Sequence, residues 1–299
     1  MGAEQWPALP LEEWKDTYQT LHMWTQVVGK VRLRRTPLVN HWWNVTFHLT
    51  PRGLTTRPMP YEGRAFAIDF DFIDHRLIVT CSGGTTRTLP LVARPVADFY
   101  RDVMRTLGEL GIAVRIWPVP VEVPDPIPFA EDFKHASYEP EHAARAWRVL
   151  VQAARVLEQF RARFVGKCSP VHFFWGSFDL AVTRFSGRRA PPRDDPMNGE
   201  AYSHEVISHG FWPGNDSLPM PVFYAYAAPE PEGFKTASVR PAGARYDTTF
   251  SEFFLPYDEV RRSASPDEVL LDFLESTYAE AALRAGWDRA ALERAAGTR

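Results

Sequence analysis

The chain has 299 residues, of which 45% are hydrophobic and 24% charged, a globular composition that excludes a wholly disordered protein. This length is enough for two domains or for one large α+β domain. The formal net charge of −3 gives no basic footprint for nucleic acid or for an anionic membrane surface. The 26 prolines outnumber the 18 glycines, which favours rigid loops and short strands over a helical bundle.

The cysteine content and the N-terminus indicate a compartment. The two cysteines, Cys81 and Cys168, make no disulfide framework, so a reducing cytoplasm is the simplest environment. The segment MGAEQWPALPLEEWK lacks the basic region and the apolar run of a secretory signal. No apolar run approaches the roughly eighteen residues that span a membrane. We therefore expect a cytoplasmic protein that binds neither nucleic acid nor membranes.

The first half predicts a helix, antiparallel strands and a second helix. The expected elements are a helix over 11–30, a strand over 40–50, three strands within 64–91 and a helix over 96–111. The first helix carries apolar residues at helical spacing, and Gly29 is expected to close it. The strand over 40–50, NHWWNVTFHLT, is predicted from its aromatic and β-branched content.

The second half repeats this plan. A helix over 147–164 ends in Val-Gly-Lys, as the first helix does, and HFFWGSFDL over 172–180 matches HWWNVTFHL over 41–49. A closing helix is expected from Ser265 as N-cap and Pro266 at the first helical position. We therefore predict an α+β fold of two similar halves, related by a possible pseudo-two-fold axis. The expected boundaries are 1–116 for the first half, 117–140 for a proline-rich connector and 141–299 for the second half.

The segment HFFWGSFDL and the residues after it predict a binding site. Read as one strand, it places Trp175 and Asp179 on one face and His172 on the core face. Polar groups among rigid aromatic side chains are typical of a pocket wall. The alternative is that His41 and His172 are hydrogen-bonded core histidines and that the other face is ordinary surface.

We expect a small polar or anionic molecule to bind, and to be transformed, in an aromatic-lined cleft. Arginine forks recognise anionic groups, and a histidine beside a carboxylate can move protons near neutral pH. The expected catalytic residues are His172, Asp179, His204 and Glu205, and the expected ligand-binding residues are Trp175, Arg184 and Trp212.

Two other functions are consistent with the sequence. One is a metal-dependent enzyme whose divalent ion is bound by some of His41, His172, His204 and His209. The spacing of His204 and His209 does not fit a zinc-protease helix, because residues five apart do not share one helix face. The other is a non-enzymatic interaction protein that uses the connector and residues 229–245 as contact surfaces.

Several specific segments, among them NHWWNVTFHLTPRGLTT, SPVHFFWGSFDLAVTRFSGR, AYSHEVISHGFWPG and FYAYAAPEPEGF, carry a resemblance to a known family. Over nearly its whole length the chain resembles an uncharacterised bacterial family, a domain of unknown function. This resemblance implies no activity, cofactor or catalytic residue.

Overall fold

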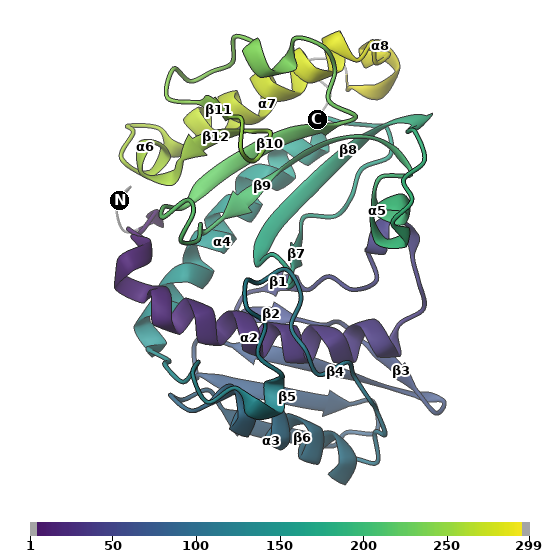
Figure 1. The fold of residues 1–299 in the computed structure, drawn as a ribbon, viewed down its shortest axis with the longest axis vertical. Coiled ribbons are helices and arrows are strands. Elements are labelled where there is room, and N and C mark those ends of the chain that lie inside the picture. Colours follow the sequence, from purple (N-terminus) through teal and green to yellow (C-terminus); the bar gives the residue numbers. More distant parts are fainter. Residues whose placement is uncertain (1–4, 295–299) are drawn as a thin grey trace. The chain divides into compact units, whose positions relative to one another are not determined.

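The computed structural model describes residues 5–294, and its strands form two six-stranded antiparallel sheets (Figure 1). The predicted α+β fold is confirmed, and each sheet has a long helix before it and another after it in the chain. The described chain divides into two units whose sequence ranges interleave. The first-sheet unit comprises residues 12–147 and 173–178, and the second-sheet unit comprises residues 5–11, 148–172 and 179–294. The predicted boundaries at 116 and 140 stay a prediction.

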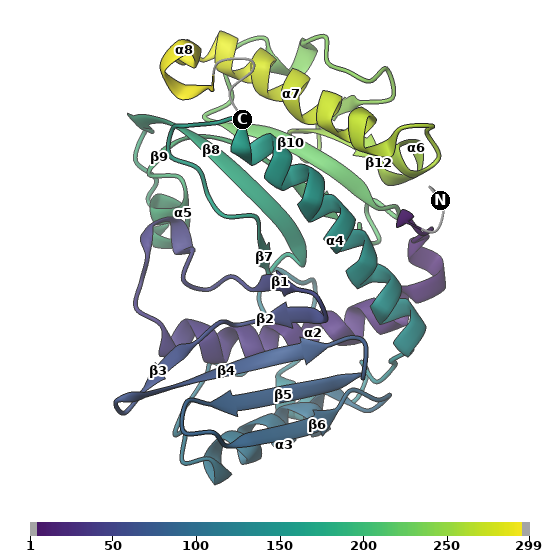
Figure 2. The ribbon, with the colours of Figure 1, turned by 180° about the vertical axis from the view of Figure 1, so that it is seen from behind.

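The first-sheet unit places two helices against one sheet. Its elements are α2 (Leu11–Arg35), η1 (Asn40–Trp42), β1 (His48–Thr50), β2 (Gly53–Thr55), β3 (Met59–Tyr61), β4 (Arg64–Asp71), β5 (Arg76–Cys81), β6 (Thr86–Pro90), α3 (Val96–Glu109) and η2 (Phe129–Glu131). The strand order is β1-β2-β4-β5-β6, with β3 paired to β4. Alternate residues of β4, namely Phe66, Ile68 and Phe70, are buried. Figure 2 shows β4–β6 lying in front of α2 and α3. Residues 112–128, which include most of the prolines of the predicted connector, form neither helix nor strand.

Helix α2 continues past Gly29 to Arg35, so the predicted helix end is wrong. A Cβ atom on Gly29 would lie 2.2–2.4 Å from three indole carbons of Trp175. The glycine is therefore a packing position inside the helix, where the missing side chain lets the indole approach. The Trp175 Nε1 donates a hydrogen bond to the carbonyl of Val45 at 2.8 Å, which fixes the ring.

The predicted strand over 40–50 is also mostly wrong. Residues 40–42 form the short helix η1, in which His41 and Trp42 have φ values of 57° and 60°. Non-glycine residues seldom adopt this left-handed region. The strand begins only at His48. The aromatic side chains that favour a strand in the sequence lie instead in an irregular loop.

The similar segment HFFWGSFDL, residues 172–180, is also not one continuous strand. Strand β7 (His172–Phe174) ends in a turn, where Phe178 has a φ of 61°, and β8 (Asp179–Arg189) begins after it. Phe47 and Phe173, which lie in the two similar motifs, exchange two backbone hydrogen bonds of 2.8 Å. The motifs therefore pair with each other locally.

The second-sheet unit covers one sheet face with helices. Its elements are α4 (Pro140–Ala162), which starts in the first-sheet unit, β7, β8, α5 (Pro196–Ala201), β9 (His204–Trp212), β10 (Val222–Ala228), η3 (Phe234–Thr236), β11 (Arg245–Asp247), β12 (Glu252–Pro256), α6 (Tyr257–Arg261), α7 (Pro266–Arg284) and α8 (Arg289–Leu292). The strand order is β11-β12-β10-β9-β8-β7. Helix α7 starts at Pro266 as predicted, although the Ser265 side chain makes no capping hydrogen bond. Residues near the N-terminus join this unit, since Trp6 Nε1 donates to Asp267 of α7 at 3.3 Å.

Candidate functional site

The two faces of the second sheet differ in chemistry. Strand register places Ser208 of β9 beside Tyr226 of β10, and Phe254 of β12 beside Tyr224 of β10. Because strand side chains alternate between faces, Glu252 lies on the same side as Phe254. We call this side the tyrosine–carboxylate face; it comprises Asp179, Ser208, Tyr224, Tyr226 and Glu252. The other side packs against α4 and α7.

A hydrogen bond between strands β10 and β8 organises the tyrosine–carboxylate face. The Tyr224 hydroxyl on β10 donates to Asp179 Oδ2 on β8 at 2.5 Å, and the ring crosses the intervening strand β9 at Gly210. A Cβ atom on Gly210 would lie 2.4 Å from the Tyr224 hydroxyl oxygen and 2.2 Å from the Leu180 carbonyl oxygen. Glycine is therefore required beneath the ring, and it allows the phenol to reach the carboxylate.

Hydroxyl groups continue the polar surface along β9 and β10. The Tyr202 and Tyr226 hydroxyls are 3.2 Å apart, and the Thr183 and Ser208 hydroxyls are 2.9 Å apart. Tyr226 also forms a hydrogen bond with the Ser208 side chain. The chain of hydroxyls therefore runs from Tyr202 through Tyr226 and Ser208 to Thr183. Each member can both donate and accept, so the chain can hold polar ligand groups or pass a proton.

The acid–base groups of this face have shifted pKa values. Burial raises the pKa of Glu252 from 4.5 to about 8, and the neighbouring carboxylates of Asp179 and Asp247 raise it further. Burial, with Asp179 as a second cause, also raises the pKa of Tyr224 well above 10. At neutral pH the Glu252 carboxyl therefore carries its proton, as does the phenol of Tyr224. Neutral acids beside an ionisable carboxylate are the arrangement that general acid–base chemistry uses.

Aromatic side chains border the polar groups. The Trp212 and Phe250 ring centroids are 5.8 Å apart, and those of Phe250 and Phe254 are 5.5 Å apart. The Tyr224 and Tyr226 rings stack with centroids 6.1 Å apart. Of the residues proposed from the sequence, this face brings together Asp179 and Trp212.

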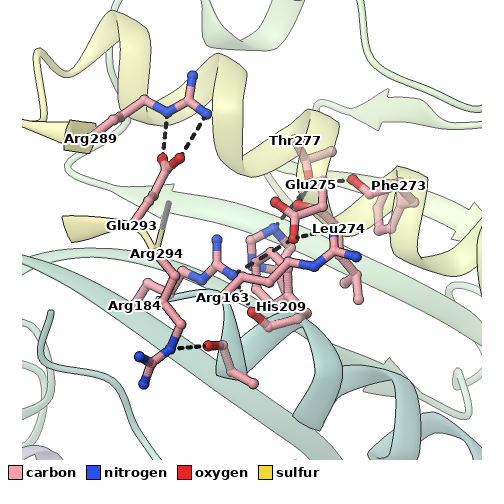
Figure 3. Close-up of polar contacts among 12 residues, drawn as sticks. Arg163, Arg184, His209, Phe273, Leu274, Glu275, Thr277, Arg289, Glu293 and Arg294 are labelled. Carbon is pink, nitrogen blue, oxygen red and sulfur yellow. Dashed lines mark hydrogen bonds and ion pairs between the residues drawn. The ribbon is translucent and has the colours of Figure 1, made fainter. Parts of the chain in front are cut away.

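Arg184, the expected anion contact, lies on the opposite, helix-covered face and is 1% exposed (Figure 3). Its guanidinium carbon is 3.4 Å from the centroid of the Phe160 ring and 4.3 Å from that of the Tyr278 ring. Its Nη2 donates to the Phe160 carbonyl oxygen and lies 3.9 Å from Glu275 Oε1. Protein groups therefore surround this cation within the core.

His209 lies on the same buried face as Arg184. Its Nε2 is 3.0 Å from the Thr277 hydroxyl, which in turn donates to the Phe273 carbonyl oxygen at 2.7 Å. The hydroxyl therefore accepts the Nε2 proton, and Nδ1 is left as the unprotonated ring nitrogen. Burial, followed by the charge of Arg184, lowers the pKa of His209 well below 6.5, so the ring is neutral.

His204 and Glu205 begin β9 and point to opposite sides of the strand. Glu205 accepts hydrogen bonds from Ser186 at 2.9 Å and from Arg188 Nη2 at 2.7 Å. His204 Nδ1 is 3.2 Å from the Ser203 hydroxyl. Burial lowers the pKa of His204, and the charges of Lys167 and Arg189 lower it further. Glu205 is therefore held by Ser186 and Arg188.

The remaining predicted residues are divided between the units. Trp175 and His41 belong to the first-sheet unit, whereas His172 begins β7 in the second-sheet unit. His41 is buried beside Trp43, with ring centroids 5.3 Å apart. Among residues 5–294, no group of three or more His, Cys, Asp or Glu side chains is arranged to hold a metal ion.

The sequence interpretation missed Tyr224, Tyr226, Gly210 and Glu252. The available signal was the alternation in FYAYAA, which places two tyrosines on one face of a short strand. Asp179 and Glu252 lie on β8 and β12, outside the β9–β10 hairpin, and no local pattern shows that the sheet places the two tyrosines between these carboxylates.

The fold and this face define an α+β protein with an antiparallel sheet that carries tyrosines and carboxylates on one side. Residues 6–294 match the model of a family of unknown function, DUF5996, and the chain belongs to that family. Comparison with curated proteins and with solved structures gives no match. No helix within the described residues is both long enough and apolar enough to span a membrane.

Proposed function

We propose that the tyrosine–carboxylate face binds a small polar molecule in the bacterial cytoplasm and transfers protons to or from it. The observation that carries this proposal is the Tyr224–Asp179 hydrogen bond of 2.5 Å over Gly210. It holds a carboxylate and a phenol in fixed positions, with Glu252 on the same face. Preorganised polar groups bordered by aromatic rings are typical of small-molecule sites.

The charges of the face favour a particular ligand chemistry. Asp179 and Glu252 are acceptors or acids, and Arg184 points into the core on the other side. A ligand with hydroxyl or amino groups can donate to Asp179 and accept from the phenols. An anionic ligand would meet carboxylates instead, so we propose a neutral or cationic polar ligand.

The proposed chemistry is general acid–base catalysis. Glu252, protonated at neutral pH, donates a proton to a ligand oxygen or nitrogen, and Asp179 accepts one while Tyr224 fixes its orientation. Positioned carboxyl groups of this kind contribute about 10²–10⁴-fold to a rate.

The proposal is tested with a panel of monosaccharides, polyols and amino alcohols, using thermal shift and Trp fluorescence as readouts. We expect one chemical group of the panel to stabilise the wild-type protein and to lose this effect in Asp179→Asn and Tyr224→Phe. The matched control is Tyr100→Phe, which removes a hydroxyl in the first-sheet unit. Ligand-induced shifts of equal size in Asp179→Asn, Tyr224→Phe and the control would contradict the proposal, as would a panel with no binder.

A further inference from the structure

Four arginines of the first-sheet unit converge on the segment 56–61, which comprises the link after β2 and strand β3. Arg32 Nη1 donates to the Thr56 carbonyl oxygen, and Arg35 Nη2 donates to the Pro60 carbonyl oxygen at 3.0 Å. The guanidinium carbons of Arg35 and Arg64 lie 4.9 Å and 5.7 Å from the centroid of the Tyr61 ring. The fourth, Arg57, belongs to the segment itself. We call these residues the arginine cluster: Arg32, Arg35, Arg57 and Arg64.

The backbone holds Arg57 in a fixed position. Its φ is 59°, and its amide donates to the Thr55 hydroxyl at 3.0 Å. The Thr56 hydroxyl donates to the Arg57 carbonyl oxygen at 2.9 Å and accepts from the Ile68 amide at 2.9 Å. A left-handed non-glycine residue persists only where its surroundings determine the conformation, and such residues gather at functional sites.

The arginine cluster has no counter-ion within residues 5–294. Elsewhere, arginines such as Arg52 and Arg94 form ion pairs of 2.8 Å with aspartates, whereas no member of the cluster forms one. Arg32 is 6% exposed, and its Nε is buried without a hydrogen-bond partner, as is the Nε of Arg35. Burying a cation without an opposite charge is costly.

The cluster members also repel one another. Burial lowers the pKa of Arg32 to about 10, and the nearby charge of Arg57 contributes to the shift. His48 aligns with Thr55 in the β1–β2 pair. Burial lowers its pKa to about 4, and the charges of Arg57 and Arg32 lower it further. The guanidinium charges therefore add positive potential at both groups.

Two acidic residues lie near the cluster, and neither neutralises it. Asp69 aligns with Thr55, and its carboxylate forms a hydrogen bond with the Thr55 hydroxyl. Burial is the main cause that raises its pKa, and Asp71 raises it further. Glu62 lies in the exposed turn between β3 and β4. The negative end of the α2 dipole favours cations in its last turn, but it does not account for Arg57 or Arg64, which lie outside the helix.

We propose that Arg32 and Arg57, with Arg35 and Arg64 around them, bind the phosphate group of a small phosphorylated molecule. Thr56 holds Arg32 through Nη1 and the Nε is buried, so Nη2 is the donor that reaches a phosphate oxygen, and Arg57 supplies the second guanidinium. Charge-assisted hydrogen bonds of this kind are the ones by which arginine recognises phosphate. The site lies within the first-sheet unit and does not depend on the tyrosine–carboxylate face.

Inorganic phosphate is the probe, added to the full-length protein at constant ionic strength with chloride as the replaced anion. Calorimetric titration should give saturable binding to the wild-type protein, together with a rise in melting temperature. Arg57→Gln should weaken binding about tenfold or more, as expected for loss of a charge-assisted hydrogen bond. Arg57 is exposed, so this variant should fold, and its circular dichroism spectrum verifies that.

The matched control is Arg87→Gln, which removes the same charge from the exposed strand β6 of the same unit. It should leave phosphate binding unchanged. The proposal is overturned if phosphate acts no differently from chloride, if Arg57→Gln binds phosphate as tightly as the wild-type protein, or if Arg87→Gln weakens binding as much as Arg57→Gln does.

Discussion

Tyr224 donates a hydrogen bond of 2.5 Å to Asp179 from two strands away, across the backbone of Gly210. Asp179 is 8% exposed and Tyr224 7%, so both partners are largely removed from water. A hydrogen bond from a phenol to a buried carboxylate has two consequences, since it satisfies a group that is costly to bury and sets its orientation. Glycine at position 210 is the condition for both.

Gly210→Ala should destabilise the protein by about 1–3 kcal/mol, the usual cost of overpacking a core. The new methyl group would lie against the Leu180 carbonyl oxygen and the Tyr224 ring, so either the ring or the strands must move. The free energy of unfolding from urea denaturation measures the change. Gly83→Ala is the control, because a Cβ atom there meets nothing within 4 Å and the backbone φ is ordinary. Equal stabilities of the two variants would refute the packing role of Gly210.

Glu252→Gln should change the pH dependence of stability. The folded-state pKa of Glu252, about 8, lies above the ordinary value of 4.5, so the folded protein binds the proton more tightly than the unfolded chain. The stability that the protonated Glu252 carboxyl gives to the folded state is fully present below pH 4.5. It is lost as the pH rises toward and through 8. Each unit of upward shift corresponds to about 1.4 kcal/mol.

Unfolding free energies of the wild type and Glu252→Gln at pH 5, 7 and 9 measure this effect. The wild type should lose stability relative to the variant as the pH rises, because glutamine keeps a neutral side chain throughout. Parallel pH profiles for the two proteins would show that Glu252 titrates at its ordinary value. The comparison cancels the contributions of other titrating groups, which both proteins share.

How far the sequence predicts the fold depends on whether a signal is local. Helix α3 and the three strands over 64–91 follow from apolar periodicity and turn residues, which act over a few positions. The sequence predicts strands at the loop that contains His41 and at the turn before Asp179, because aromatic content favours strands wherever tertiary contacts do not decide otherwise. In these two segments tertiary contacts determine the backbone conformation, because the backbones of Phe47 and Phe173 pair with each other.

The candidate site depends still more on non-local pairing. Asp179 is predicted from its place near the end of the aromatic segment HFFWGSFDL, and Trp212 from its place in the segment AYSHEVISHGFWPG. Arg184 matched the expected residue type for an anion contact, yet strand alternation turns it toward α4 and α7. Its face depends on where β8 begins, and one residue of register reverses the side of every residue that follows.

Arg184→Lys should destabilise the second-sheet unit by about 3 kcal/mol or more, since a buried charge without its partners is strongly unfavourable. Lysine keeps the charge but has no planar guanidinium to stack on Phe160 and Tyr278. Urea denaturation measures the loss.

Arg188→Lys, four residues along the same strand, is the control. Arg188 forms a surface ion pair with Glu205, so it should change stability by about 1 kcal/mol or less. A similar cost at both positions would contradict the buried role of Arg184.

Asp132→Asn should weaken the first-sheet unit and remove part of its acid sensitivity. Asp132 is fully buried and accepts hydrogen bonds from the His135 Nδ1 at 2.7 Å and the His135 amide at 3.0 Å. Burial raises its pKa, but these bonds outweigh burial and hold the pKa below 3.8. The carboxylate therefore contributes stability above its ordinary pKa and loses it as the pH falls through the lower folded value. At neutral pH the variant should lose about 1–3 kcal/mol of stability, the cost of an imperfectly satisfied buried group.

Denaturation at pH 7 and at pH 3 tests both parts of this prediction, with Asp125→Asn in the exposed connector as the control. A variant whose deficit at pH 3 is as large as at pH 7 would show that the ionised carboxylate is not the stabilising species.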